Sequence, residues 1–193
     1  MEKVEINKNM KLSEHFTLGE MCKTKHDTED GNIPSRVHIE NLKRICENWL
    51  EDLRYSYNML YVHSGVRPQS KVVAGVRPQS KVAGDCTLAP DPGAAPASRK
   101  EEPIVINSGY RSPEVNQLAG GATNSNHLTG CAVDIRCAGK EQMIRYASIL
   151  LDIADGSKQE YDELLLEQHG SVCWLHFAVR PKENRRIIRF LRV

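Results

Sequence analysis

Two polar side chains lie inside apolar segments that otherwise have the character of buried strands, and this pattern constrains the fold of the chain more than any other feature. Asp134 lies within the apolar residues 131–135, and His176 lies within residues 174–179. An ionised carboxylate in such a setting costs several kcal/mol unless it is paired or binds a metal ion. The sequence therefore predicts a compensating partner beside Asp134.

A third polar residue, His127, lies before Asp134 in a turn of small polar residues, 123–130. A single histidine in a strand is more often an ordinary core residue than a metal ligand, so the hypothesis depends on the combination. Two histidines and one carboxylate, with space for water, are typical of a catalytic zinc site. We therefore interpret His127, Asp134 and His176 as ligands of Zn²⁺.

The residues around these positions also resemble a known family. The shared pattern consists of Ser-Gly-Tyr-Arg at residues 108–111, the spaced residues Ser125, His127, Gly130, Ala132 and Asp134, and the pair Trp174 and His176. It resembles the zinc D-Ala-D-Ala peptidases, which include D,D-carboxypeptidases, D,D-dipeptidases, phage endolysins and the zinc-binding hedgehog signalling domain. The resemblance extends over residues 11–179 with one interruption. It implies a zinc peptidase that acts on the peptidoglycan stem peptide.

Arg111 is the candidate for substrate recognition. It follows a predicted strand at residues 103–107, in a turn that contains Gly109. A guanidinium can bind a carboxylate through two parallel hydrogen bonds. In the resembled family the matching arginine binds or orients the substrate peptide, which implies the same role for Arg111.

A general base is expected on the strand that precedes His176. If residues 161–179 form a hairpin with an even-length turn, Glu167 lies opposite Trp174 and on the same face as His176. The resembled family uses an acidic side chain beside the last histidine, but here the residue three positions before His176 is a cysteine. Hedgehog-like members place the equivalent glutamate at the end of the preceding strand, as Glu167 is placed. Glu163 lies on the same face and is the second candidate.

Local patterns predict four helices. Thr17 and Glu20 have the spacing of a capping box, and apolar residues recur at helical spacing between residues 35 and 57. The Ser-Pro pair at residues 112–113 starts a helix that the glycines at 120–121 end. A further helix is predicted over residues 140–154, with Ile144, Ala147, Leu151 and Ala154 on its apolar side.

Strands are predicted at residues 103–107, 131–137, 161–167 and 173–179, and the basic segment 180–192 is predicted to form a solvated strand at an edge of the core. Helices and strands that do not alternate strictly indicate a single α+β domain with a mostly antiparallel sheet and flanking helices. We divide the chain into an N-terminal helical part at residues 1–57, an insertion at 58–102 and a zinc-binding catalytic core at 103–193.

The insertion interrupts the resemblance. It contains a tandem decapeptide, at residues 65–72 and again at 75–82, followed by a tract rich in Pro, Ala and Gly at 88–98. Two copies are too few for a solenoid, and the tract has the composition of a linker, so we expect a disordered or loosely ordered insertion. Arg67 and Arg77 in the repeat imitate the Arg111 segment, but only Arg111 leads directly into the candidate ligands.

Composition excludes several classes of protein. The net charge is +1 with acidic and basic residues interleaved, which argues against a nucleic-acid-binding protein, and no apolar run approaches membrane-spanning length. Residues 1–10 lack the pattern of a signal peptide. We therefore expect a monomer that is cytoplasmic at synthesis and reaches the cell wall by another route, such as release by lysis if it is encoded by a phage.

These observations lead to one main functional hypothesis and one alternative. The main hypothesis is a zinc-dependent peptidase, either a D,D-carboxypeptidase or an endolysin-type endopeptidase, that hydrolyses a bond in the peptidoglycan stem peptide through metal-activated water. The alternative is a hedgehog-like binding module that contains zinc but has no peptidase activity. The position of the general base distinguishes the two.

Overall fold

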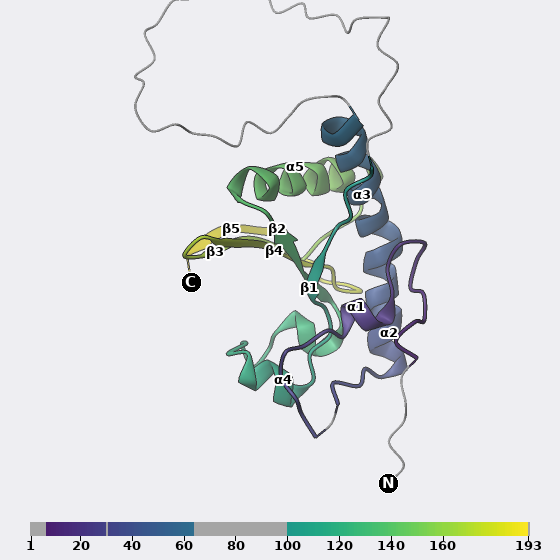
Figure 1. Ribbon diagram of the computed structural model, residues 1–193, viewed down its shortest axis with the longest axis vertical. Helices are drawn as coiled ribbons and strands as arrows, with labels where there is room; N and C mark the ends of the chain where they lie inside the picture. Colours follow the sequence, from purple (N-terminus) through teal and green to yellow (C-terminus); the bar gives the residue numbers. More distant parts are fainter. Residues whose placement is uncertain (1–6, 30, 64–99, 193) are drawn as a thin grey trace, which may run out of the picture.

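The computed structural model describes residues 7–29, 31–63 and 100–192. Within these ranges the chain forms an α+β fold, in which helices surround a five-stranded sheet with the strand order β1-β2-β4-β3-β5 (Figure 1). The strands are β1 (Ile106–Ser108), β2 (Ala132–Cys137), β3 (Glu163–His169), β4 (Val172–Ala178) and β5 (Ile187–Arg192). Only the pair β3 and β5 is parallel, so the predicted fold class is confirmed. The tandem repeat and its two arginines lie outside the described residues.

The structure describes five α-helices, two of which start where their capping residues predict. The five helices are α1 (Leu18–Met21), α2 (Arg36–Ile45), α3 (Glu51–Tyr57), α4 (Pro113–Leu118) and α5 (Lys140–Ser157), with π-helical stretches at Cys46–Leu50 and Asn58–His63 and a 3-10 turn at Asn126–Thr129. The Thr17 hydroxyl accepts a hydrogen bond from the Glu20 amide, and the Glu20 carboxylate accepts one from the Thr17 amide. Ser112 caps α4 in the same way through the Val115 amide. Both predicted starts are confirmed.

The long helical segment that begins at α2 extends further than its apolar spacing predicted. It continues past Tyr57 to His63. The side chain of Asn58 explains the extension, because its amide nitrogen donates to the carbonyl groups of Arg54 and Glu102 and its oxygen accepts from the Glu102 amide. These bonds join the helix to the point where the described chain resumes, so the two ends of the insertion lie next to each other.

Helix α5 buries a stripe that overlaps the predicted one only in part, because Ala147 and Ala154 are buried but Ile144 is not. Its buried side chains are Met143, Tyr146, Ala147, Ile149, Leu150 and Ala154, whereas Ile144 is 57% exposed. The helix packs against α3 and against strands β2, β3 and β4, and Tyr146 contacts Tyr57 of α3 edge to face. The choice of face therefore depends on two packing partners that the helix sequence does not reveal.

The hairpin of β3 and β4 has the register that an even-length turn predicts. Glu167 pairs with Trp174 and Leu165 pairs with His176 across the two strands. A two-residue turn that begins with Gly170 connects them, and Gly170 has a positive φ of 57°. Because paired residues share a face, the face that carries His176 also carries both Glu163 and Glu167.

The two faces of the sheet have different partners. The face opposite to His176 is apolar and is covered by helices: Phe177 of β4 contacts Trp49 of the long helical segment, with ring centroids 5.0 Å apart. Figure 1 shows α5 along one side of the sheet and α4 on the other side. The face with the polar residues is thus left available for a site. No helix of the described residues is long and apolar enough to cross a membrane.

Candidate metal centre

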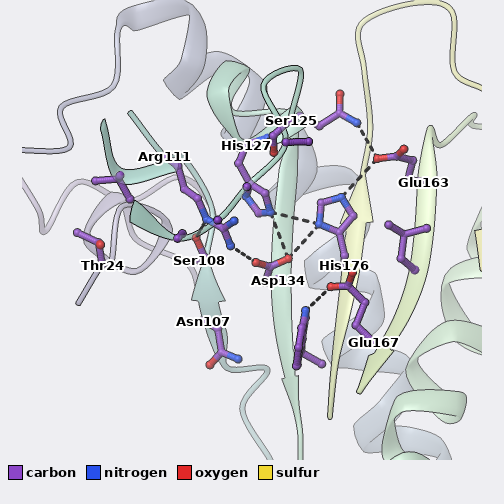
Figure 2. A pocket seen from close by; sticks show the side chains of 18 of the residues that line it. Thr24, Asn107, Ser108, Arg111, Ser125, His127, Asp134, Glu163, Glu167 and His176 are labelled. Atoms are coloured by element: carbon purple, nitrogen blue, oxygen red, sulfur yellow. Dashed lines mark hydrogen bonds and ion pairs between the residues drawn. The ribbon is translucent and has the colours of Figure 1, made fainter. Parts of the chain in front are cut away.

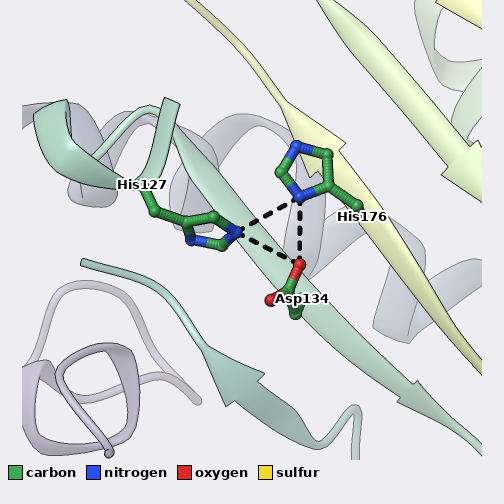
Figure 3. A group of neighbouring side chains, drawn as sticks. All are labelled: His127, Asp134 and His176. Carbon is green, nitrogen blue, oxygen red and sulfur yellow. Dashed lines mark hydrogen bonds and ion pairs between the residues drawn. The ribbon is translucent and has the colours of Figure 1, made fainter. Parts of the chain in front are cut away.

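Three elements bring the candidate ligands together. Asp134 lies in the middle of β2 and pairs directly with His176 of β4, so the two side chains lie next to each other on one face. His127 lies on the 3-10 turn Asn126–Thr129, where the Ser125 hydroxyl accepts a hydrogen bond from its amide. Figure 3 shows the three side chains converging from these elements.

The distances between the ligand atoms fit a zinc ion. His127 Nε2 lies 3.2 Å from Asp134 Oδ1 and 3.2 Å from His176 Nδ1, and His176 Nδ1 lies 3.0 Å from Asp134 Oδ1. Tetrahedral ligands with bonds of about 2.0–2.1 Å to zinc are about 3.3 Å apart. The three residues are also buried, at 2%, 7% and 8% exposure. The predicted ligand set therefore forms one cluster of suitable size.

In each histidine, one ring nitrogen faces the cluster and the other, the outer nitrogen, faces a neighbouring group. The hydrogen bond made by the outer nitrogen determines whether the nitrogen that faces the cluster carries a proton. His127 Nδ1 lies 2.5 Å from the carbonyl oxygen of Gly109, which can only accept, so this nitrogen carries the proton. His176 Nε2 faces Glu163 Oε2 at 3.5 Å, and a carboxylate likewise accepts. In their neutral forms both rings then direct an unshared electron pair toward Asp134 Oδ1, which is also an acceptor. Three converging acceptors require a cation, either a proton or a metal ion.

The pKa shifts of the cluster show the same requirement. Burial by itself opposes ionisation of Asp134, but His127 and His176 hold the pKa of this carboxyl well below its usual range. Burial lowers the pKa of His127. Burial also opposes the charged form of His176, yet hydrogen bonds to Asp134 and Glu163 raise the pKa of His176 to about 9. Without a metal, one proton on His176 compensates the buried carboxylate, and a divalent cation would replace it.

Each residue of the Ser-Gly-Tyr-Arg segment has a structural role at this centre. Arg111 contacts Asp134 Oδ2 through Nη2 and donates from Nε to the Ser108 hydroxyl at 2.8 Å. Asp134 therefore presents its other oxygen to the histidines. Tyr110 is buried and stacks on the half-buried His38. The contact between Arg111 and a metal ligand was not expected from the sequence.

Two glycines allow the close approach of these segments. A side chain at Gly109 would place its Cβ 2.5 Å from the backbone oxygen of Met21, so only glycine fits beside α1. Gly130 ends the 3-10 turn with a positive φ of 68°, and a Cβ there would lie 2.6 Å from the backbone oxygen of His38. These contacts fix the carbonyl that orients His127 and the turn that carries it.

A comparison with known families agrees with this geometry. Residues 97–159 match the family model described as Peptidase M15. This part of the chain is therefore similar to proteins of the Peptidase M15 family. The resemblance to the zinc D-Ala-D-Ala peptidases is thereby confirmed at the level of the family. The M15 match includes Arg111, His127 and Asp134 but ends before His176 and both glutamates, which the sheet brings into the same site. No curated protein matches the chain.

The two candidate bases beside the metal ligands have different surroundings. Glu163 contacts His176 Nε2, accepts from Asn126 at 3.0 Å and accepts from Arg185 at 2.7 Å, and the hydrogen bond to His176 is the main reason that its pKa is lowered. Glu167 accepts a hydrogen bond from the Trp174 indole, and burial raises its pKa. Both lie on the predicted face (Figure 2), but only Glu167 has the raised pKa that suits a base.

An open cavity of about 800 Å³ contains His127, Asp134 and His176. Figure 2 shows Arg111 and Ser108 on one side of the ligands, with Glu163 and Glu167 on the other. The loop after α1 adds Lys23, Lys25 and His26 to the wall of this cavity. Sequence reasoning missed this loop because nothing in its spacing connects it with the ligands. Asn126 was also missed, although its position next to His127 could have drawn attention to it.

Proposed function

We propose that this protein is a zinc-dependent peptidase that hydrolyses a bond in the peptidoglycan stem peptide, as a D,D-carboxypeptidase or an endolysin-type endopeptidase. The observation that carries the proposal is the convergence of three buried acceptors, from His127, Asp134 and His176, in a cavity that also contains a carboxyl group of raised pKa. A site used only for structure would be expected to be closed by a fourth protein ligand. The M15 match supports the peptidase class.

The chain's own residues divide the work of hydrolysis among them. Bound Zn²⁺ would supply Lewis acidity, polarising a carbonyl and lowering the pKa of water. Glu167 accepts the proton of the attacking water and returns it to the leaving amine, for which its raised pKa is suited. The indole of Trp174 orients this carboxylate through its N–H group. Glu163 keeps His176 in the tautomer that leaves Nδ1 free.

Arg111 combines two roles in this proposal. Its Nη2 and Nε atoms bind Asp134 and Ser108, and Nη1 forms no hydrogen bond with the described part of the chain. We assign Nη1 to the substrate, as a donor to a carbonyl or carboxylate of the peptide. The lysines of the loop after α1 line the same cavity and add positive charge near this end. The site of action would be the cell wall, because the substrate is part of it.

One experiment tests the proposal directly. Purified protein is incubated with synthetic stem peptides and with peptidoglycan, with and without a chelator, and the products are identified by mass spectrometry while bound zinc is measured by elemental analysis. We expect about one zinc per chain, cleavage that the chelator abolishes and restored cleavage on addition of zinc. Bound zinc without cleavage of any substrate would favour the hedgehog-like binding module. Absence of zinc binding would overturn both.

A further inference from the structure

We propose that Arg185 is a positioning residue of the metal centre, which holds the Glu163 carboxylate against the outer nitrogen of His176. This inference rests on the proposed zinc site but concerns a residue outside the matched family segment and outside the ligand set. Arg185 lies in the connection between β4 and β5. Through Glu163, it would determine the orientation and tautomer of the ring that provides Nδ1 to the metal.

The contacts of Arg185 connect two adjacent carboxylates at the start of β3. Its Nη2 donates to Glu163 Oε1 at 2.7 Å and to Asp162 Oδ2 at 2.7 Å, and its Nε donates to Asp162 Oδ1 at 2.8 Å. The side chain of Asp162 is fully buried. Asp162 thus fixes the plane of the guanidinium, and the guanidinium in turn fixes the Glu163 oxygen that does not face His176. The other oxygen is left to contact His176 Nε2 at 3.5 Å.

Asn126 connects the same cluster with the other histidine. Its amide nitrogen donates to Asp162 Oδ2 at 2.9 Å and to Glu163 Oε2 at 3.0 Å. Because Asn126 immediately precedes His127, the turn that carries one ligand and the carboxylate that orients the other share one hydrogen-bond network. This network explains why two adjacent carboxylates are tolerated beside the site: Arg185, together with Arg180 at 3.6 Å from Asp162 Oδ1, supplies the compensating charge, and Asn126 fills the remaining acceptor positions.

Hydrogen bonds of the β4–β5 connection hold Arg185 in this position. Asn184 closes a tight loop by accepting from the Arg180 amide and donating to the Arg180 carbonyl. The amides of Arg185, Arg186 and Ile187 bond Asp162 Oδ1, the Tyr161 carbonyl and the Asp162 carbonyl. Arg186 has a φ of 52°, in the left-handed region that is unfavourable for a residue other than glycine. The surrounding bonds impose this conformation directly beside Arg185.

An alternative explanation is that Arg185 only stabilises the fold through Asp162. The two explanations differ in what they predict for the metal. A purely structural arginine would change the melting temperature of the metal-free protein and leave the zinc affinity of the folded fraction unchanged. A positioning residue would change the zinc affinity and the electronic environment of a metal at His176.

The test compares Arg185→Gln and Arg185→Lys with a matched control, Arg186→Gln, whose arginine pairs with Asp155 and Glu160 at the surface. Zinc affinity is measured by competition with a chromophoric chelator, the ligand field by the visible absorption of the Co²⁺-substituted protein, and folding by the melting temperature of the metal-free form. We expect Arg185→Gln to weaken zinc binding about 10- to 100-fold and to alter the Co²⁺ spectrum. Arg185→Lys should weaken zinc binding nearly as much as Arg185→Gln, because lysine keeps the charge but lacks the planar fork of the guanidinium. Arg186→Gln should leave the zinc affinity and the Co²⁺ spectrum as in the wild type.

A double-variant cycle separates the proposed route from a general effect. If Arg185 acts through Glu163, combining Arg185→Gln with Glu163→Gln should weaken zinc binding no more than Glu163→Gln alone. Additive losses, or wild-type zinc affinity and Co²⁺ spectrum in both Arg185 variants, would overturn the inference. If Arg185→Gln does not fold, Arg185→Lys and Asn126→Ala are each combined with Glu163→Gln in its place. A wild-type protein that binds no zinc would instead overturn the proposed function.

Discussion

The two histidines of the metal centre are oriented by different kinds of group on its two sides. On the side of β1 and β2, His127 is oriented by a neutral backbone carbonyl, that of Gly109, which tight packing against α1 keeps in place. On the side of the hairpin, His176 is oriented by a charged carboxylate, that of Glu163, which depends on Arg185 from beyond β4. A carbonyl keeps its role at every pH, whereas a carboxylate must be ionised and must be held. The hairpin side should therefore be the more sensitive to substitution and to charge.

The largest expected effect is the loss of a ligand, which both sides should show equally. His127→Ala, Asp134→Ala and His176→Ala each remove one of three protein ligands, so each should weaken zinc binding by more than about 100-fold, beyond the range of outer residues. Zinc content after dialysis and elemental analysis checks this. Full retention of zinc in any two of these variants would show that the cluster is not the metal site.

The second prediction separates the two glutamates of the hairpin side. Glu167→Gln should keep zinc and lose about 10²- to 10⁴-fold in peptidase activity, because it removes the base. Glu163→Gln should instead weaken zinc binding about 10- to 100-fold, because it removes the partner of His176. Zinc affinity and turnover at saturating zinc are measured for both variants. The opposite pattern, with zinc loss in Glu167→Gln and an inactive but zinc-loaded Glu163→Gln, would exchange their roles.

The third prediction concerns the other side, where Arg111 contacts Asp134. Arg111→Lys keeps the charge but loses the planar fork, so it should weaken zinc binding by about tenfold in addition to reducing turnover. Arg36→Lys, at an exposed ion pair of α2, is the matched control and should change neither. A normal zinc affinity with reduced turnover would restrict Arg111 to the substrate role that its sequence position suggested.

The smallest effect is expected for the pH dependence of stability. Burial opposes ionisation of Asp162, but hydrogen bonds from Arg185 and Asn126 lower its pKa to about 2 from the ordinary 3.8. A lowered folded-state pKa stabilises the protein above pH 4, and this stabilisation is lost as the pH falls from about 4 to 2. Asp162→Asn should lower the melting temperature of the metal-free protein at pH 6 by several degrees and flatten its decrease between about pH 4 and 2.

The result of that measurement also bears on the comparison of the two sides. If the wild type and Asp162→Asn lose stability in parallel below pH 5, other carboxyl groups dominate acid unfolding, and the cluster around Arg185 contributes little to the fold. Arg186→Gln serves as a control, because Arg186 forms exposed ion pairs with Asp155 and Glu160, and such pairs contribute little to the stability of the fold.

The local sequence determined the β1–β2 side, the hairpin register and the starts of α1 and α4. The strands predicted at 103–107 and 180–192 are instead β1 at Ile106–Ser108 and β5 at Ile187–Arg192. Capping residues define the starts of α1 and α4 because they satisfy amides of their own first turn, and Asp134 and His176 could be recognised because polar residues within apolar strands need compensation. Where an element contacts a distant partner, local patterns predicted less. The helix continues past Tyr57 because Asn58 bonds Glu102, and α5 exposes Ile144 because α3 and the sheet choose its buried face.

Only the tertiary structure determined which role each polar residue has at the site. From the sequence, Glu167 is the first and Glu163 the second candidate base on one strand face, and Arg111 is a free donor in a turn. Only the folded chain brings Arg185 and Asn126 to Glu163, Trp174 to Glu167 and Asp134 to Arg111. The physical reason is that alternation along a strand determines the face of a side chain, whereas its charge state and hydrogen bonds depend on groups from other segments.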